Sequence, residues 1–222
     1  MADFHIYIGY RTVSSWSLRA WLPLRKTGAA FEETLMRYRI PEGKAALAAV
    51  SPTGRVPLLV HRRDGREVKV WDSIAIGEYL AELFPAAKLW PVDPEARAFA
   101  RSISAEMHSG FRALRDELSM ALLEMKPKRI ENPATAAEVK RVETIWREAR
   151  ERWGRADGGP FLFGHYTIAD AMYAPVVTRF RTYCTHLDPV AAMYMEAVLK
   201  DPDFLAWEAA AAGEGPTDPE VH

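Results

Sequence analysis

Residues 51–80 read SPTGRVPLLVHRRDGREVKVWDSIAIGEYL, and this stretch decides the fold of the first part of the chain. Two β-rich runs, at 56–61 and 67–71, flank the dipeptide Asp64-Gly65, which is a strong hairpin signal. The apolar spacing over 73–84 then predicts an amphipathic helix. We therefore expect an antiparallel pair of strands followed by a helix.

Pro57 interrupts the first of these strands. Proline lacks a backbone donor, so it is tolerated only at an edge or bend, or in a tight turn around a cis bond. Such a bend leaves the main chain of Val56 free to pair with an extended peptide. Downstream, Asp72 offers an acceptor for an ammonium group, and Ser73 stands at a helix N-terminus, which favours a carboxylate. A γ-glutamyl peptide carries both groups.

These residues also have ordinary structural interpretations. Pro57 could be an edge-strand proline, and Asp72 could be an N-cap of the helix that follows. Their occurrence together favours a ligand clamp, which would contain five residues: Arg55, Val56, Pro57, Asp72 and Ser73.

The segments before residue 51 complete an α/β domain. The sequence predicts a strand at 4–10, a helix at 14–26 that stops at Thr27-Gly28, a strand at 31–37, and then a loop with a short helix. The order βαβ-ββα places the first strands in a parallel crossover and ends with an antiparallel pair.

The second part of the sequence is almost wholly helical. We expect a first domain at 1–84, a proline-rich linker at 85–93, an all-helical domain at 94–212, and a disordered tail at 213–222. Apolar spacing predicts helices at 94–126, 134–153, 167–181, 190–199 and 203–211. Asp170 is expected to cap the helix that begins near Thr167, which is a structural role.

Charge and composition exclude several classes of protein. The 29 basic and 30 acidic side chains offer no electrostatic footprint for nucleic acid or an anionic membrane. A single cysteine, Cys184, excludes an internal disulfide, and the six histidines lack metal-ligand spacing. No run reaches about 18 apolar residues. We expect a soluble, cytoplasmic protein without a metal.

Four segments together resemble the cytosolic glutathione S-transferases: SSWSLRAWL at 14–22, SPTGRVPLLV at 51–60, WDSIAIGEYL at 71–80 and TIADAMYAPVV at 167–177. The resemblance implies a thioredoxin-like first domain, a cis bond at Pro57, glutathione as cosubstrate, an acceptor site in the helical domain, and a homodimer. Members of that family usually have Glu or Gln before the serine of the clamp. Aspartate here must lie closer to the ammonium group, or reach it through water.

The segment 14–19, SSWSLR, resembles the SSCSxR signature of the zeta class, the maleylacetoacetate isomerases. In that class the first serine is the partner of the thiol, which projects onto Ser14, with Ser15 as the alternative. Trp16 replaces the cysteine of the signature, and Ala20-Trp21 replaces a valine and an arginine, so the isomerase name does not follow. The ordinary interpretation is that these serines cap the helix they begin.

Ser14 has a simple chemical role if it contacts the thiol. A free thiol ionises near pH 8.5, so only a few per cent is thiolate at neutral pH. A hydroxyl that donates to the thiolate, together with the positive end of a helix dipole, lowers that pKa. Ser14 would then be a stabilising donor, neither a nucleophile nor a base.

Candidates for the acceptor side come from the helical domain. Met107, Phe111 and Tyr183 could line an apolar acceptor pocket, although such residues more often belong to a core. His108 lies on the helix that forms one wall of the acceptor site in the family. Arg179 could hold an acidic acceptor, and a solvated helix face is the more ordinary interpretation.

A cation is also needed for the glycine carboxylate of glutathione. Any of the clustered basic residues Arg37, Arg39 and Lys44 could supply it.

The sequence thus predicts a glutathione transferase whose serine stabilises the thiolate that attacks a small, mostly apolar electrophile. A zeta-like glutathione-dependent cis-trans isomerase and a non-catalytic glutathione-binding protein are the alternatives. A thiol-disulfide reductase is disfavoured, because the serine segment has no cysteine and Cys184 lies far from it in the sequence.

Overall fold

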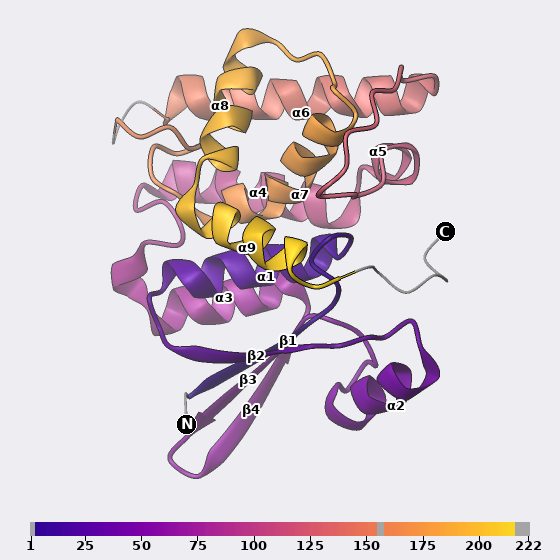
Figure 1. Cartoon of the computed structure of the whole chain (residues 1–222). Helices are drawn as coiled ribbons and strands as arrows, with labels where there is room; N and C mark the ends of the chain where they lie inside the picture. The colour runs from indigo at the N-terminus through magenta and orange to yellow at the C-terminus, as the bar shows by residue number, and fades with distance from the viewer. Residues whose placement is uncertain (1–2, 155–157, 216–222) are drawn as a thin grey trace.

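The computed structural model describes residues 3–154 and 158–215 (Figure 1). The first region holds four strands and three α-helices: β1 (Phe4–Ile8), α1 (Ser15–Lys26), β2 (Phe31–Leu35), α2 (Pro41–Val50), β3 (Leu58–Arg63), β4 (Arg66–Trp71) and α3 (Ser73–Leu83). A short 3₁₀ turn, η1 (Pro85–Ala87), follows. The second region contains α4 (Pro94–Ser109), α5 (Arg112–Glu117), α6 (Pro133–Arg152), α7 (Ile168–Thr182), α8 (Pro189–Leu199) and α9 (Pro202–Ala212).

The four strands form one mixed sheet in the order β2-β1-β3-β4. β1 pairs parallel with β2 and antiparallel with β3, and β3 pairs antiparallel with β4 across the predicted hairpin. The parallel crossover and the terminal antiparallel pair are therefore confirmed. In Figure 1, α1 and α3 lie between the sheet and the helical region, while α2 lies apart at the other side of the sheet.

One apolar core joins the two regions. Leu18 and Leu22 of α1 are fully buried and belong to the same cluster as Met172 and Val176 of α7. Because apolar side chains from both regions are buried in this core, the hydrophobic effect stabilises the contact between the regions as well as each region by itself. The boundary between sheet and helices is therefore a fixed surface on which a site can be built.

The predicted helix at 94–126 is wrong in its length. α4 ends at Ser109, and Phe111 has a left-handed backbone conformation (φ 58°) before α5 begins. Gly110 precedes this turn, and glycine lowers helix propensity. The apolar spacing continues across the break, because Phe111 and Leu114 are both buried, and this continuity hid the turn.

The segments between and after the predicted domains pack against them. Leu89 of the proline-rich linker accepts from the backbone of Ile168, and the Trp90 indole donates to Glu78. Most of the tail predicted at 213–222 lies outside the described residues, but Glu214 is described and pairs with Arg11. Among the described helices, none has the length and apolar character needed to cross a bilayer.

Candidate functional site

A pocket of about 350 Å³ gathers the residues of the predicted clamp. It lies where β3 begins, β4 ends and α3 begins, against the first turn of α1 and the end of α4. The lining residues are Trp16, Thr53, Arg55, Val56, Pro57, Trp71, Asp72, Ser73 and His108. All five clamp residues of the sequence prediction therefore face one space.

The Val56–Pro57 peptide bond is cis, as the resemblance implies. The ladder of β3 begins only at Leu58, which pairs with Trp71 and Tyr7. Val56 therefore lies outside the sheet, at the edge of the pocket, where its main chain can meet an extended peptide.

The two carboxylate oxygens of Asp72 make different contacts. One oxygen accepts from the backbone of Ile74 at 3.0 Å and caps α3, while Oδ2 lies 3.2 Å from Nε2 of His108. The residue has a φ of 73°, a conformation that places its side chain over the helix start. The capping interpretation and the clamp interpretation are thus compatible, because different oxygens serve them.

Ser73 supplies an unoccupied donor beside this carboxylate. Its side chain is buried, and its Oγ has no hydrogen-bond partner among the described residues. A buried hydroxyl without a partner is costly, so a ligand carboxylate at this helix N-terminus would satisfy it.

Ser14 stands at the N-cap position of α1, yet its side chain does not cap the helix. Its hydroxyl donates to Oγ of Ser17 at 2.8 Å, and the same Ser17 oxygen accepts from the backbone of Gly9 at 2.9 Å. The N-cap interpretation of Ser14 is therefore wrong. Ser17, which sequence reasoning treated only as a capping residue, is the side chain that orients Ser14.

Gly9 connects Ser14 to the clamp. A Cβ built on this glycine would lie 2.5 Å from a ring carbon of Tyr38, 3.1 Å from Oγ of Ser14 and 3.1 Å from a methyl group of Val56. The Ser14 hydroxyl, the Tyr38 ring and the cis-proline segment therefore pack around Gly9, although Ser14 is not among the residues that line the clamp pocket.

Three arginines gather behind Trp16, where the α/β region meets the helices. The guanidinium groups of Arg19 and Arg115 lie 4.8 Å and 5.1 Å from the indole centroid. Arg19 and Arg179 are buried, and both Nη atoms of Arg19 lack a hydrogen-bond partner among the described residues. Such an arrangement of like charges is costly unless an anion joins it.

Burial is the main cause that lowers the pKa values of these groups, and neighbouring positive charge adds to it for Arg19 and Arg179. Burial lowers the pKa of Arg19 well below its ordinary value, and the charges of Arg115 and Arg179 lower it further. Burial, followed by the charge of Arg115, lowers the pKa of Arg179 to about 10. The cluster therefore places three largely buried positive charges close together beside the pocket, with carboxylates compensating Arg19 and Arg115 only in part.

Comparison with known proteins agrees with this geometry. The family models described as "Glutathione S-transferase, N-terminal domain" and "Glutathione S-transferase, C-terminal domain" match residues 13–83 and 132–210. The chain belongs to the glutathione S-transferase family.

Several relatives of this chain are named maleylacetoacetate isomerase. A "Probable maleylacetoacetate isomerase" of Caenorhabditis elegans is 34% identical over 121 residues, which is 54% of this chain and 54% of the worm protein. The chain thus matches about half the length of that relative. The maleylacetoacetate isomerase of Rattus norvegicus is 28% identical over 83% of this chain and 81% of its own.

A solved structure extends the likeness to the whole fold. Maleylacetoacetate isomerase from Anaeromyxobacter dehalogenans 2CP-1, crystallised with bound GSH, has a TM-score of 0.69 and 25% sequence identity. The superposition covers 96% of this chain and 98% of that chain.

The residues that the sequence predicted for the acceptor site differ in where the structure places them. His108 lines the pocket, whereas Met107 and Phe111 belong to the buried core. The Tyr183 hydroxyl lies 3.1 Å from the Ser119 hydroxyl. Arg179 is buried, so the interpretation as a solvated helix face is wrong. The sequence gives no signal for this burial, because the segment TRFRTY at 178–183 is mostly polar.

The predicted cations for the glycine carboxylate lie away from the pocket lining. Arg37 and Lys44 are exposed, and the Arg39 guanidinium lies over the Tyr38 ring, at 5.9 Å from its centroid. Arg55 is the basic residue that the structure places in the lining.

Asp170 has the structural role predicted for it. Its Oδ2 accepts from the backbone and the hydroxyl of Thr167, at 2.7 Å and 2.9 Å, and its Oδ1 accepts from the backbone of Leu162. The predicted capping box is confirmed.

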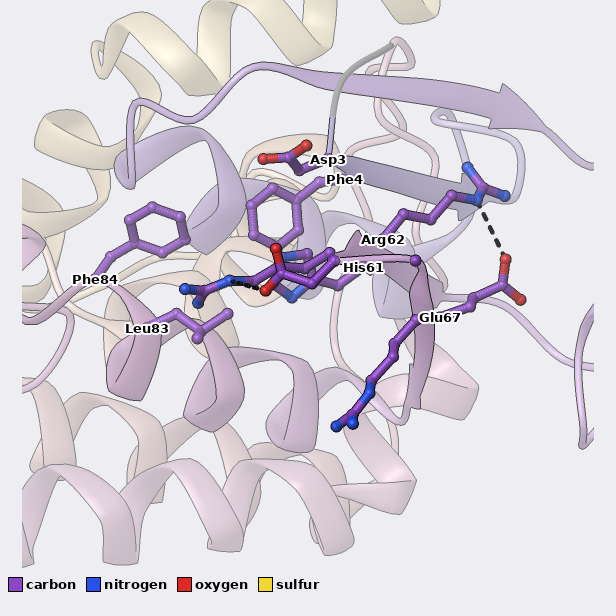
Figure 2. A pocket seen from close by; sticks show the side chains of 11 residues that line it. Asp3, Phe4, His61, Arg62, Glu67, Leu83 and Phe84 are labelled. Carbon is purple, nitrogen blue, oxygen red and sulfur yellow. Dashed lines mark hydrogen bonds and ion pairs between the residues drawn. The ribbon is translucent and has the colours of Figure 1, made fainter.

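A larger hollow of about 740 Å³ lies at the opposite end of the β3–β4 hairpin (Figure 2). Phe4, Leu83 and Phe84 line it, and its charged rim contains the ion pair between Arg62 and Glu67. Two of the rim arginines, Arg62 and Arg63, pair with Glu67 and Asp64, and none of the lining residues belongs to the clamp. The hollow is therefore separate from the clamp and is not a candidate for the thiol site.

Proposed function

We propose that this chain is a glutathione transferase in which Ser14 stabilises the thiolate of bound glutathione. The observation that carries the proposal is the position of Gly9, against which both the Ser14 hydroxyl and the cis-proline segment lie. The γ-glutamyl end would bind at Asp72 and Ser73, the peptide backbone would pair with Val56, and Arg55 is the lining cation available to the ligand.

The thiol would ionise with its proton released to solvent. The Ser14 hydroxyl, which donates to Ser17 in this structure, would rotate to donate to the sulfur. The N-terminus of α1 adds a positive electrostatic potential at the same place. Rate enhancement would come from a larger thiolate fraction and from proximity, without a covalent bond between enzyme and substrate.

The acceptor would carry carboxylate groups. The sequence led us to expect a mostly apolar electrophile, but Arg19, Arg115 and Arg179 gather behind Trp16, which lines the pocket. An anionic acceptor near this cluster would favour the charged forms of these arginines, which burial disfavours.

The second candidate is a glutathione-dependent cis-trans isomerase. The arginine cluster and the isomerase relatives favour it. In that reaction the thiolate adds to a cis double bond, the resulting single bond rotates, and elimination of the thiolate restores glutathione and leaves the trans isomer. The transferase instead retains the carbon–sulfur bond in its product.

The test is the ultraviolet thiolate band of bound glutathione, followed across pH in the native protein, Ser14→Ala and Ser15→Ala. We expect Ser14→Ala alone to raise the midpoint. An unchanged midpoint in both variants would exclude activation by serine.

Turnover distinguishes the two reactions. Maleylacetone and a chlorinated nitrobenzene are offered in parallel while total thiol is measured, because a transferase consumes thiol and an isomerase does not. Glutathione binding without turnover of either compound would indicate a non-catalytic binding protein.

A homodimer and a cytoplasmic location stay predictions of the family resemblance. Sedimentation velocity of the purified chain tests the first, and fractionation of cells tests the second.

A further inference from the structure

The loop between β1 and α1, residues 9–14, is held by the carboxyl-terminal part of the chain. The backbone N–H of Arg11 donates to Oε2 of Glu214 at 3.0 Å, and the Arg11 carbonyl accepts from the Trp207 indole at 3.2 Å. The Arg11 guanidinium also pairs with Glu214 and Glu33. Both main-chain polar groups of a residue in the serine loop are thus bound by side chains about 200 positions away.

This connection is buried and lies at the end of α9. The side chains of Arg11 and Glu214 are 8% and 6% exposed, and Trp207 is fully buried. The Arg11 guanidinium also lies over the Trp207 ring, 5.4 Å from its centroid. Figure 1 shows α9 next to α1, with its end directed toward the loop that precedes α1.

The connection bears directly on Ser14. The backbone N–H groups of Val13 and Ser14 both donate to the carbonyl of Tyr10, so residues 10–14 form one compact turn. Displacement of Arg11 would deform this turn and move the Ser14 hydroxyl. Leaving the buried N–H and C=O of Arg11 without partners is costly, so the loop would rearrange if Glu214 and Trp207 released it.

We propose that Glu214 and Trp207 are positioning residues that fix Ser14 at the sulfur of glutathione. This inference rests on the proposed function, in which Ser14 stabilises the thiolate. It gives the helical region a part in thiol activation as well as in acceptor binding. Neither residue contacts the clamp pocket, so glutathione affinity depends on them less than thiol ionisation does.

The experiment compares Glu214→Ala, Glu214→Gln and Trp207→Phe by the thiolate midpoint of bound glutathione. Glu214→Ala removes the acceptors of the Arg11 N–H, and Trp207→Phe removes the donor to its carbonyl while retaining a ring. Glu214→Gln keeps an acceptor for the Arg11 N–H but turns an amide donor toward the Arg11 guanidinium, so its midpoint should lie between those of the native protein and Glu214→Ala. Loss of the negative charge alone would lower the midpoint, opposite to the expected shift.

The matched control is Asp203→Asn. Asp203 also joins α9 to α1 through a carboxylate, by pairing with Arg25 and Lys26, but at the far end of α9 from the serine loop. We expect the control to leave the midpoint unchanged. Glu214→Ala and Trp207→Phe should each raise it by at least half of the shift that Ser14→Ala causes, and amide exchange of residues 10–14 should accelerate.

The outcomes separate this inference from the proposed function. If Ser14→Ala raises the midpoint while Glu214→Ala and Trp207→Phe do not, serine activation stands and the positioning role is overturned, even if amide exchange accelerates. If Ser14→Ala itself has no effect, the proposed function fails first. A midpoint raised equally by Glu214→Gln and Glu214→Ala would also overturn the role of the hydrogen bond.

Discussion

Nε2 of His108 lies 3.2 Å from Oδ2 of Asp72, the carboxylate oxygen that we propose for the ammonium group of glutathione. The same imidazole meets Trp16 edge-on, with ring centroids 5.1 Å apart. His108 therefore connects the helical region to the clamp and, under the proposed function, would compete with the ligand for Asp72.

Removal of this competitor should tighten glutathione binding. Exposed ion pairs are worth up to about 1 kcal/mol, so we expect His108→Ala to lower the dissociation constant of glutathione by up to about fivefold in titration calorimetry. His186→Ala, an exposed histidine outside the clamp, is the control. Weaker binding in His108→Ala would instead mean that the imidazole contacts glutathione itself.

The charge of Asp72 can be tested without disturbing the helix it caps. Asparagine is an equally good N-cap and tolerates a positive φ, so Asp72→Asn should keep the contact with Ile74 and the free energy of unfolding. Loss of a hydrogen bond between charged groups should weaken glutathione binding by about tenfold or more. Unchanged affinity in calorimetry would show that the ammonium group binds elsewhere.

The structure brings the residues predicted for the glutathione side into one pocket but places most of those predicted for the acceptor side in the core, for a physical reason. The clamp is local: Pro57, Asp72 and Ser73 lie in a hairpin and a helix start whose geometry follows from neighbouring residues. The acceptor side depends on packing between helices that are distant in sequence. The burial of Arg179 beside Arg19 is therefore invisible in either helix considered separately.

The same limit explains two other differences. The turn at Phe111 leaves the apolar spacing of its helix intact, so periodicity could not detect it. The partner of Glu214 lies at Arg11, and an acidic residue in a Gly/Pro-rich tail gives no sign of a distant partner. The signal available for Ser17 was its spacing from Ser14, which places both on one helix face.

The arginine cluster should lower the free energy of unfolding of the protein while it promotes binding of an anionic acceptor. Arg179 is buried without a carboxylate, and its pKa is lowered to about 10, so Arg179→Met should raise the free energy of unfolding by about 1 kcal/mol or more. The same variant should lose turnover of carboxylate-bearing acceptors while glutathione affinity is retained. Urea unfolding and steady-state kinetics measure the two effects.

Arg112→Met is the control for both measurements, the free energy of unfolding and the turnover. Arg112 is exposed and pairs with Asp116 one helical turn away, so neither stability nor turnover should change appreciably. A destabilised Arg179→Met would indicate that the buried guanidinium is already compensated in the folded protein.

Replacement of Asp170 by its isostere asparagine should destabilise the folded protein. Both of its oxygens accept hydrogen bonds, from Leu162 and from Thr167, so the amide of Asp170→Asn would set a donor against a donor. We expect a loss of about 2 to 4 kcal/mol in urea unfolding, typical of a broken buried network. Asp93→Asn should be nearly neutral, because Asp93 caps α4 through one oxygen.

Asp170 should also leave a signature in the pH dependence of stability. Burial raises the pKa of its carboxyl above the ordinary value, so between the unfolded and folded pKa values the folded protein binds more protons at this group than the unfolded chain does. Its contribution to stability therefore falls as pH rises through that interval. The difference in unfolding free energy between native protein and Asp170→Asn should accordingly shrink as pH rises there, and a difference that grows would mean that the hydrogen bonds outweigh burial.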